Sequence, residues 1–124
     1  MKSKQTILVV DDTPENISVV KGVLGALYKV KAVLNGETAL KVAEADTPDL
    51  ILLDVMMPEM DGYEAMRRIR KQEKYKKLPI IALTAKAMKG DRDKCIAAGA
   101  NDYLAKPIII EKFLSLLRVW LFHK

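Results

Sequence analysis

Three short runs of consecutive apolar residues lie well apart along the chain, at residues 7–10, 50–53 and 80–83. Continuous apolar runs of this length are typical of central strands in a parallel sheet, because both faces of such a strand are covered. Two further segments suit the edges of a sheet, since residues 28–33 alternate between apolar and polar side chains and the run at 103–105 is short. The pattern therefore predicts five strands.

The segment after the first predicted strand has the spacing of a helix. Pro14 suits a first helical position, and Thr13 before it is a candidate cap. The apolar residues that repeat at helical spacing are Ile17, Val20, Leu24 and Leu27. We therefore expect the first crossover helix here.

The other links between predicted strands carry helical patterns too. Asn35 can cap a second helix, which the Thr-Pro pair at residues 47–48 ends. A third helix is expected from about Gly62, a fourth over about residues 88–98, and a fifth from near Ile109. Strand and helix thus alternate along the whole chain.

This alternation sets the fold class. Short links between alternating strands and helices require a parallel sheet with right-handed crossovers and helices on both faces. The edge assignments favour the strand order 2-1-3-4-5, so the predicted fold is α/β, a doubly wound five-stranded parallel sheet of the flavodoxin-like (βα)5 kind. The chain has 124 residues, half of them apolar, and is expected to form a single domain over residues 1–124.

Charge and cysteine content limit the binding partners and the cellular compartment that we expect for the protein. The net charge of +5 is too diffuse to argue for direct nucleic acid binding, and the basic residues that crowd into residues 67–77 are interpreted as a solvated helix end running into a loop. Cys95 stands alone, which favours a reducing compartment and a buried, structural side chain. The first apolar run is too short for a signal peptide or a membrane span, so we expect a cytoplasmic protein without membrane contact.

Polar residues follow four of the predicted strands at the edge where doubly wound sheets bind ligands. Asp11 and Asp12 follow the first strand, and Asp54 ends the third. Thr84 ends the fourth strand, and Lys106 follows the fifth. Each has a simpler explanation alone, as a helix cap, a strand-end hydroxyl or a surface ammonium group. Because all five side chains are predicted to lie at the same end of the sheet, a functional site is favoured over five separate explanations.

Three carboxylates brought so close together would repel one another unless a cation lay among them. A hard divalent ion with a preference for oxygen ligands fits, and Mg²⁺ is the candidate because it keeps water ligands and works with phosphate oxygens.

Four motifs together resemble the receiver domain of bacterial two-component response regulators. They are Asp11-Asp12, the run Asp-Val-Met-Met-Pro-Glu-Met-Asp-Gly at residues 54–62, Leu-Thr-Ala at residues 83–85 and Lys106-Pro107. The resemblance covers nearly the whole chain. It implies a signalling phospho-acceptor rather than an enzyme, supplied with phosphoryl groups by a histidine kinase or a phosphotransfer protein and able to assist its own phosphorylation and dephosphorylation.

The resemblance also implies a role for each matching residue. Asp54 looks like the phospho-acceptor. Asp12, Asp54 and the backbone carbonyl of Met56 would bind Mg²⁺, with help from Asp11. Such a site suits phosphoryl transfer, which needs positioning and charge stabilisation above all.

Three further residues take part in the implied mechanism. Lys106 would form an ion pair with the phosphorylated carboxylate, and a cis Lys106-Pro107 bond would aim it. Thr84 would donate its hydroxyl to a phosphoryl oxygen. Tyr103 resembles the aromatic switch residue that turns inward when Thr84 moves, although simple edge-strand packing explains it equally well. The surface formed by helix 4, strand 5 and helix 5 would respond.

Met56 and Lys86 stand two residues beyond Asp54 and Thr84, where similar domains tune the attack of water on the phosphoaspartate. We hypothesise that the apolar Met56 slows self-dephosphorylation.

Two alternatives concern function and context. Haloacid dehalogenases also use an aspartyl nucleophile with Mg²⁺, but their DxD motif after the first strand differs from the Asp-Asp-Thr at residues 11–13. Residues 82–92 resemble receivers of hybrid sensor histidine kinases, whereas residues 11–16 resemble receivers ahead of cyclic-dinucleotide signalling enzymes. The output, and whether the chain is a stand-alone protein or part of a longer one, stay open.

The last predicted helix has a broad apolar surface. Leu116 and Trp120 lie off the stripe made by Ile110, Phe113, Leu114, Leu117 and Leu121. The helix is therefore predicted to contact a second copy of the domain or an adjoining domain. The alternative is that Trp120 simply packs against its neighbours.

Overall fold

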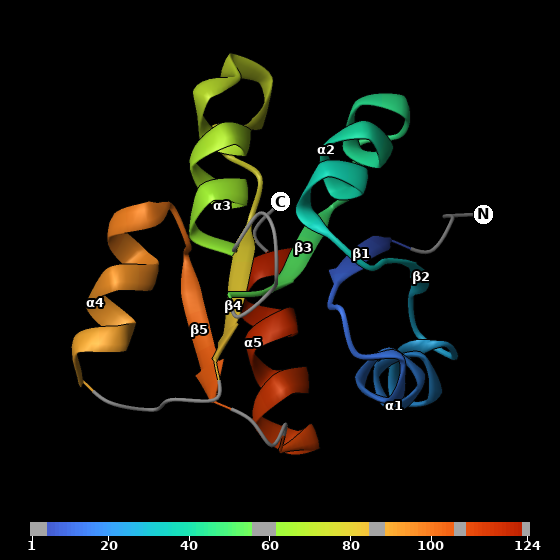
Figure 1. The fold of residues 1–124 in the computed structure, drawn as a ribbon. Coiled ribbons are helices and arrows are strands. Elements are labelled where there is room, and N and C mark those ends of the chain that lie inside the picture. Colours follow the sequence, from blue (N-terminus) through green and yellow to red (C-terminus); the bar gives the residue numbers. More distant parts are fainter. Residues whose placement is uncertain (1–4, 56–61, 85–88, 106–108, 123–124) are drawn as a thin grey trace.

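A parallel sheet forms the centre of the computed structural model, which describes residues 5–55, 62–84, 89–105 and 109–122 (Figure 1). Its strands are β1 (Thr6–Val10), β2 (Lys29–Val33), β3 (Leu50–Asp54), β4 (Ile80–Thr84) and β5 (Asp102–Ala105). They lie in the order β2-β1-β3-β4-β5, and every pairing is parallel. The predicted fold class and strand order are confirmed.

Helices connect successive strands and cover both faces of the sheet. They are α1 (Pro14–Leu24), α2 (Gly36–Ala45), α3 (Gly62–Lys71), α4 (Lys89–Ala98) and α5 (Ile110–Phe122), with a short 3₁₀ helix, η1 (Glu73–Tyr75), after α3. Side chains of α2, α3 and α4 join one hydrophobic cluster, and those of α1 and α5 join the other. In Figure 1, α1 and α5 lie on one face of the sheet, and α2, α3 and α4 lie on the other.

Alternating side chains of the strands feed both clusters. In β1, Leu8 and Val10 belong to the α2–α4 side, whereas Ile7 and Val9 belong to the α1–α5 side. Every residue of β3 and β4 is buried, while β2 and β5 each bury one. Each buried Val, Leu or Ile side chain contributes roughly 1.5–3 kcal/mol, so the central strands supply much of the driving force. The assignment of central and edge strands is confirmed.

α1 ends earlier than the spacing of apolar residues predicts. Val20 and Leu24 are buried as expected. Leu27, however, lies beyond the helix and is 57% exposed, so its place on the stripe is wrong. The helix ends at Leu24, and residues 25–27 form a turn in which the Leu27 and Tyr28 N–H groups both donate to the Leu24 carbonyl (2.9 and 2.8 Å). Thr13 does occupy the N-cap position, but its side chain makes no capping hydrogen bond.

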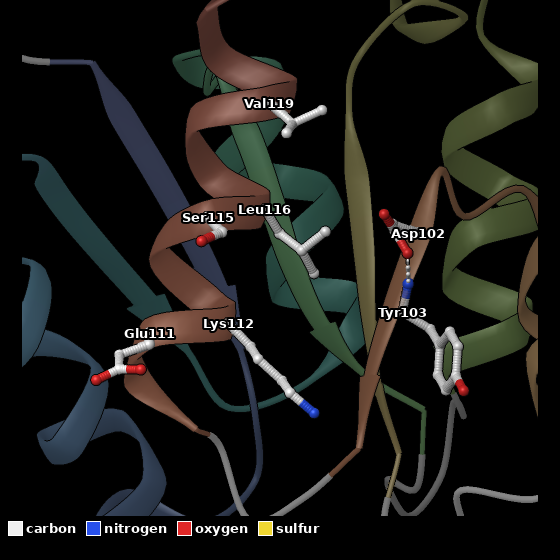
Figure 2. A pocket seen from close by; sticks show the side chains of 7 residues that line it. All are labelled: Asp102, Tyr103, Glu111, Lys112, Ser115, Leu116 and Val119. Atoms are coloured by element: carbon white, nitrogen blue, oxygen red, sulfur yellow. Dashed lines mark hydrogen bonds between the residues drawn. The ribbon is translucent and has the colours of Figure 1, made fainter.

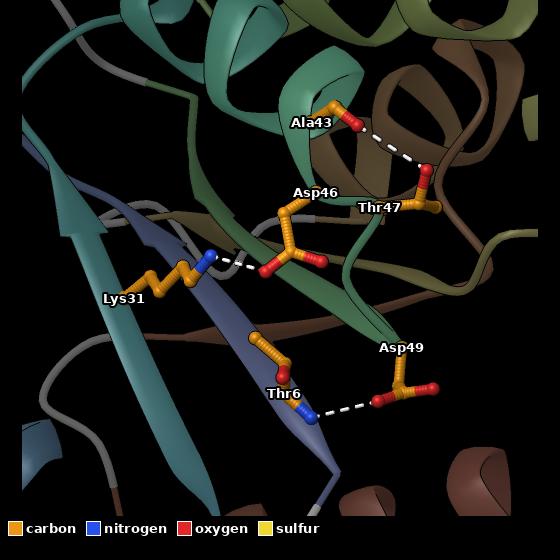
Figure 3. Close-up of polar contacts among 6 residues, drawn as sticks. All are labelled: Thr6, Lys31, Ala43, Asp46, Thr47 and Asp49. Atoms are coloured by element: carbon orange, nitrogen blue, oxygen red, sulfur yellow. Dashed lines mark hydrogen bonds and ion pairs between the residues drawn. The ribbon is translucent and has the colours of Figure 1, made fainter.

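Polar contacts fix α2 and its link to β3. Asn35 caps the helix as predicted, accepting a hydrogen bond from the Thr38 N–H (2.8 Å). At the other end the Thr47 hydroxyl donates to the Ala43 carbonyl (3.2 Å), as Figure 3 shows. These bonds satisfy backbone groups that the ends of a helix leave without an intrahelical partner.

The loop after α2 is also joined to the two neighbouring strands. Asp46 forms an ion pair with Lys31 of β2, and this hydrogen bond lowers the pKa of the Asp46 carboxyl (Figure 3). Asp49 accepts a hydrogen bond from the Thr6 N–H at the start of β1 (2.7 Å). The amino ends of β1 and β3 are thereby held together by a side chain as well as by the sheet.

Arg70 differs from the rest of the basic stretch. The six other Lys and Arg residues between 67 and 77 are exposed, as predicted, but Arg70 is half-buried and the prediction is wrong for it. Its guanidinium donates to the carbonyls of Gly99 (2.9 Å) and Tyr75 (2.7 Å) and to Asn101 Oδ1 (2.6 Å). Asn101 Oδ1 also accepts from the Ile80 N–H (2.9 Å). Arg70 therefore joins the end of α3 to η1, β4 and the turn after α4.

Only glycine at position 99 leaves room for the Arg70 side chain to reach the Gly99 carbonyl without strain. Its φ of 125° lies in the region that favours glycine, and a Cβ there would approach Arg70 Cγ to 2.7 Å. Burial lowers the pKa of the Arg70 guanidinium, but arginine stays protonated in proteins. The hydrogen bonds are therefore charge-assisted.

Replacing Arg70 with Met is expected to lower the free energy of unfolding by about 1.5–3 kcal/mol, the range for hydrogen bonds to a charged group. Urea unfolding followed by circular dichroism measures this as a lower midpoint at an unchanged slope. Arg68→Met is the matched control, because Arg68 lies on the same helix, is 50% exposed and pairs with Glu64. The control should lose no more than about 0.5 kcal/mol. Equal losses in the two variants would contradict the special role of Arg70.

Candidate functional site

The carboxyl ends of the three central strands bring together four of the predicted site residues. Asp11 and Asp12 directly follow β1, Asp54 ends β3, and Thr84 ends β4. The register pairs Val10 with Leu53, so the residues that follow them, Asp11 and Asp54, stand level on adjacent strands.

The burial of these residues sets them apart from ordinary surface acids. Asp11 is 0% exposed, Asp54 1% and Thr84 2%, while Asp12 is exposed. Carboxylate oxygens of Asp11, Asp12 and Asp54 all lie within 4.8 Å of one another. Two carboxylates taken out of water beside a third are costly to hold without compensating donors or a cation. Their oxygen atoms form the kind of ligand set that a hard divalent cation such as Mg²⁺ prefers.

Hydrogen bonds from the start of α1 orient Asp11. Its Oδ1 accepts from the Thr13 N–H (2.9 Å), and its Oδ2 accepts from Asn16 Nδ2 (3.2 Å). The Thr13 hydroxyl lies 3.4 Å from Asp12 Oδ1. Asn16 is a site residue that the sequence analysis did not identify. The signal was present, because Asn16 is the third residue of a helix that Pro14 starts directly after the Asp-Asp pair.

Tyr103 lies on the neighbouring edge strand, on the side of the sheet that α2, α3 and α4 cover. The register pairs it with Ala82, which is on the same face of β4 as Thr84 because side chains alternate along a strand. Tyr103 is partly buried against that cluster, and the Arg92 guanidinium lies 6.0 Å from the centre of its ring. The predicted site residues Met56 and Lys106, together with Lys86 and Pro107, lie outside the described residues.

A groove of about 500 Å³ lies between β5 and α5. Figure 2 shows Asp102 and Tyr103 on the strand and Leu116 and Val119 on the helix. Trp120 is partly buried, and its indole N–H donates to Asp102 Oδ2 (3.3 Å). The packing of Trp120 against its own domain, one of the two explanations offered for its position, is therefore observed.

Among the described residues, no helix is long and apolar enough to cross a membrane.

Comparison with known proteins identifies the family. The sequence model of the response regulator receiver domain matches residues 7–118. The response regulator PleD of Caulobacter vibrioides is 43% identical over 103 residues, which are 82% of this chain but 23% of PleD. The response regulator DivK of Brucella anthropi is 31% identical and is matched over 94% of this chain and 96% of its own length. The chain thus spans under a quarter of the first relative and nearly all of the second.

A solved structure gives the same result in three dimensions. It is the receiver domain of the sensor histidine kinase PA1611 from Pseudomonas aeruginosa, crystallised with a magnesium ion in its active site cleft. The two chains are 45% identical and superpose with a TM-score of 0.89 over 97% of this chain and 99% of the other. These matches favour a receiver over the dehalogenase alternative.

The fold, the acidic site and the relatives of this chain agree in pointing to one family. The strand order, the buried acids at the carboxyl edge and the match over residues 7–118 all describe a domain of two-component signalling, whose general role is to accept a phosphoryl group. This chain belongs to the response regulator receiver domain family.

Proposed function

We propose that Asp54 is the phospho-acceptor and that the phosphoryl group comes from a phosphohistidine of a histidine kinase or a phosphotransfer protein. The observation that carries the proposal is the group of Asp11, Asp12 and Asp54, whose carboxylate oxygens lie within 4.8 Å of one another. Asp54 belongs to the central strand of the sheet, whereas Asp11 and Asp12 lie just beyond the end of β1. An ionised carboxylate on a rigid strand is a suitable nucleophile for phosphoryl transfer.

The oxygen atoms of this cluster would hold the metal. Asp11, Asp12 and Asp54 supply carboxylates, and the carbonyl of Met56 completes the proposed set. Bound Mg²⁺ would supply positive charge against the oxygens of the phosphoryl group.

Side chains of the protein carry out the other steps of the proposed phosphoryl transfer. An Asp54 carboxylate oxygen forms the new bond to phosphorus while the phosphorus–nitrogen bond to the donor histidine breaks. The bonding electrons stay on the imidazole nitrogen, which then takes up a proton from solvent. Thr84 donates its hydroxyl to a phosphoryl oxygen, and the Lys106 ammonium group pairs with the phosphorylated carboxylate. Hydrolysis of the acyl phosphate later restores Asp54, so the domain acts on itself and on no separate substrate.

The Tyr103 ring is proposed to change its position when Asp54 is phosphorylated. Thr84 and Tyr103 belong to paired strands and to the same face of the sheet. A Thr84 side chain drawn toward the phosphoryl group changes the space available to Tyr103, whose ring is only partly buried. The surface formed by α4, β5 and α5 is the proposed output.

Incubation with acetyl phosphate and Mg²⁺ is expected to add one phosphate to the native chain, measured by intact-mass spectrometry. The adduct should be absent without Mg²⁺ and absent in Asp54→Asn. Asp93→Asn is the matched control, because Asp93 is an exposed acid on α4, and it should be phosphorylated normally. An adduct that persists in Asp54→Asn would refute the assignment of the acceptor.

Met56→Asn is expected to speed loss of the phosphoryl group. An amide can orient an attacking water where a thioether cannot, and one such hydrogen bond, worth about 1.4 kcal/mol, corresponds to about a tenfold change in rate. The decay of the phosphate adduct over time, after removal of acetyl phosphate, gives the rate. An unchanged or slower rate would contradict the proposed role of Met56.

We also propose that α5 contacts a partner, either a second copy of the domain or an adjoining domain. Its side chains Ile110 and Val119 are 47% and 51% exposed, and the groove beside β5 is lined by both apolar and charged groups. Trp120 is already engaged with Asp102, so the contact would rest on the neighbouring apolar residues.

Sedimentation with and without beryllofluoride tests the version with two copies. Beryllofluoride mimics the phosphoryl group on Asp54, and a shift from monomer toward dimer is expected in its presence. Val119→Lys should abolish the shift without altering phosphorylation, because it puts a charge into the proposed interface far from Asp54 in the sequence. A monomer under both conditions would exclude self-association.

A further inference from the structure

The side chain of Asn16 points back to the acidic site rather than away from it. Asn16 is the third residue of α1, and its N–H donates to the Thr13 carbonyl (3.1 Å) in the first turn. Its amide Nδ2 donates to Asp11 Oδ2 at 3.2 Å. Asparagine is a weaker helix former than Ala or Leu, so this position gives up helix propensity while making a contact to a carboxylate.

Two different donors hold the two oxygens of Asp11. The Thr13 N–H bonds Oδ1 and the Asn16 amide bonds Oδ2, so rotation of the carboxylate about its own axis would break both bonds. Asp11 is 0% exposed, so water cannot replace either donor at little cost. The Thr13 donor belongs to the backbone and is present with any residue except proline at position 13, whereas the Asn16 donor depends on the side chain at position 16.

The charge of the donor is as important as its position. A lysine or arginine side chain could also bond Asp11, but its full positive charge would oppose the entry of a cation into the cluster. An amide donates the hydrogen bond and adds no net charge. Asn16 therefore orients Asp11 and leaves the negative charge of Asp11, Asp12 and Asp54 available to a metal ion.

We propose that Asn16 is a positioning residue that sets the affinity of the Asp11–Asp12–Asp54 cluster for a divalent cation by fixing the orientation of Asp11. The inference rests on the proposed function of this cluster as a magnesium site. Residues that orient metal ligands typically change metal affinity about 10–100-fold when they are removed.

Asn16→Ala is expected to weaken Mg²⁺ binding by about tenfold or more in the absence of any phosphoryl donor. Isothermal titration calorimetry with magnesium chloride measures the affinity directly. A second readout is the rise in the urea midpoint that Mg²⁺ produces, since a ligand stabilises the folded state according to its affinity. Ser18→Ala is the matched control, because Ser18 is an exposed residue on the same helix, and its Mg²⁺ affinity should equal that of the native chain.

Two further variants separate positioning from a general effect on folding. Asn16→Gln keeps the neutral amide and should retain more of the affinity than Asn16→Ala. Asn16→Lys keeps a donor but adds a charge, and should bind Mg²⁺ less well than Asn16→Gln. Urea midpoints measured in EDTA report the stability of each variant without metal. Losses of affinity that simply follow those midpoints would overturn the proposal.

A double-mutant cycle tests whether Asn16 acts through Asp11. In an Asp11→Asn background, titrated with Mg²⁺ until binding saturates, Asn16→Ala should cause little further loss. An equal loss in both backgrounds would overturn the proposal, as would an Asn16→Ala variant with native affinity. In that last case an intact, Asp54-dependent phosphate adduct would show that the proposed function stands and only the role of Asn16 fails. A native chain that neither binds Mg²⁺ nor forms the adduct would refute both.

Discussion

The burial of carboxylates at one edge of the sheet is the constraint on which this structure depends. Asp11 and Asp54 are almost completely removed from water. An ionised carboxylate that is buried without partners costs several kcal/mol, so a fold tolerates it only where donors or cations offset that cost. The parallel strands place both groups side by side because β1 and β3 are neighbours in register. The apolar residues before them keep the strands buried, so the acids cannot move out to solvent without breaking the core.

A different set of polar contacts lies at the amino ends of the strands, away from the acidic cluster. Asp49 bonds the start of β1, and Arg70 and Asn101 join α3 to the start of β4 and the turn after α4. These contacts involve fixed backbone groups and make no use of the acidic cluster. They tie the amino ends of β1 and β4 to neighbouring segments, whereas the buried carboxylates lie at the carboxyl ends of the strands.

The strands could be predicted because their signal is local. A run such as residues 50–53 is apolar at every position, and few structures other than a covered central strand accommodate it. Residues at the ends of those strands then follow from topology, which explains why Asp11, Asp54 and Thr84 were found together. Leu27 shows the limit, since periodicity describes the face of a helix but does not say where the helix stops. That information lies in the turn at residues 25–27, which the apolar pattern does not include.

Arg70 and Asn16 are harder to assign from sequence, for a different reason. Two of the partners of Arg70, Gly99 and Asn101, are 29 and 31 residues away, so only the packed fold reveals that one of seven similar basic side chains is half-buried. Asn16 is close to Asp11 along the chain, but an asparagine early in a helix is usually explained by local backbone contacts. Its role depends on the direction of α1 relative to β1.

The position of β5 bears on the proposed coupling between the acidic site and a distant surface. Tyr103 packs against the cluster that includes α3 and α4 residues, and it also lines the groove beside α5. Its strand pairs with β4, which ends in Thr84. Under the proposed mechanism, a Thr84 side chain drawn toward Asp54 changes the space beside Tyr103, and a turn of that ring alters packing on the α4 side of β5. Side chains in a close-packed protein shift between discrete arrangements rather than by small continuous steps. An edge strand with one large, partly buried side chain against the α4 side of the sheet is therefore a suitable place for the proposed two-state response.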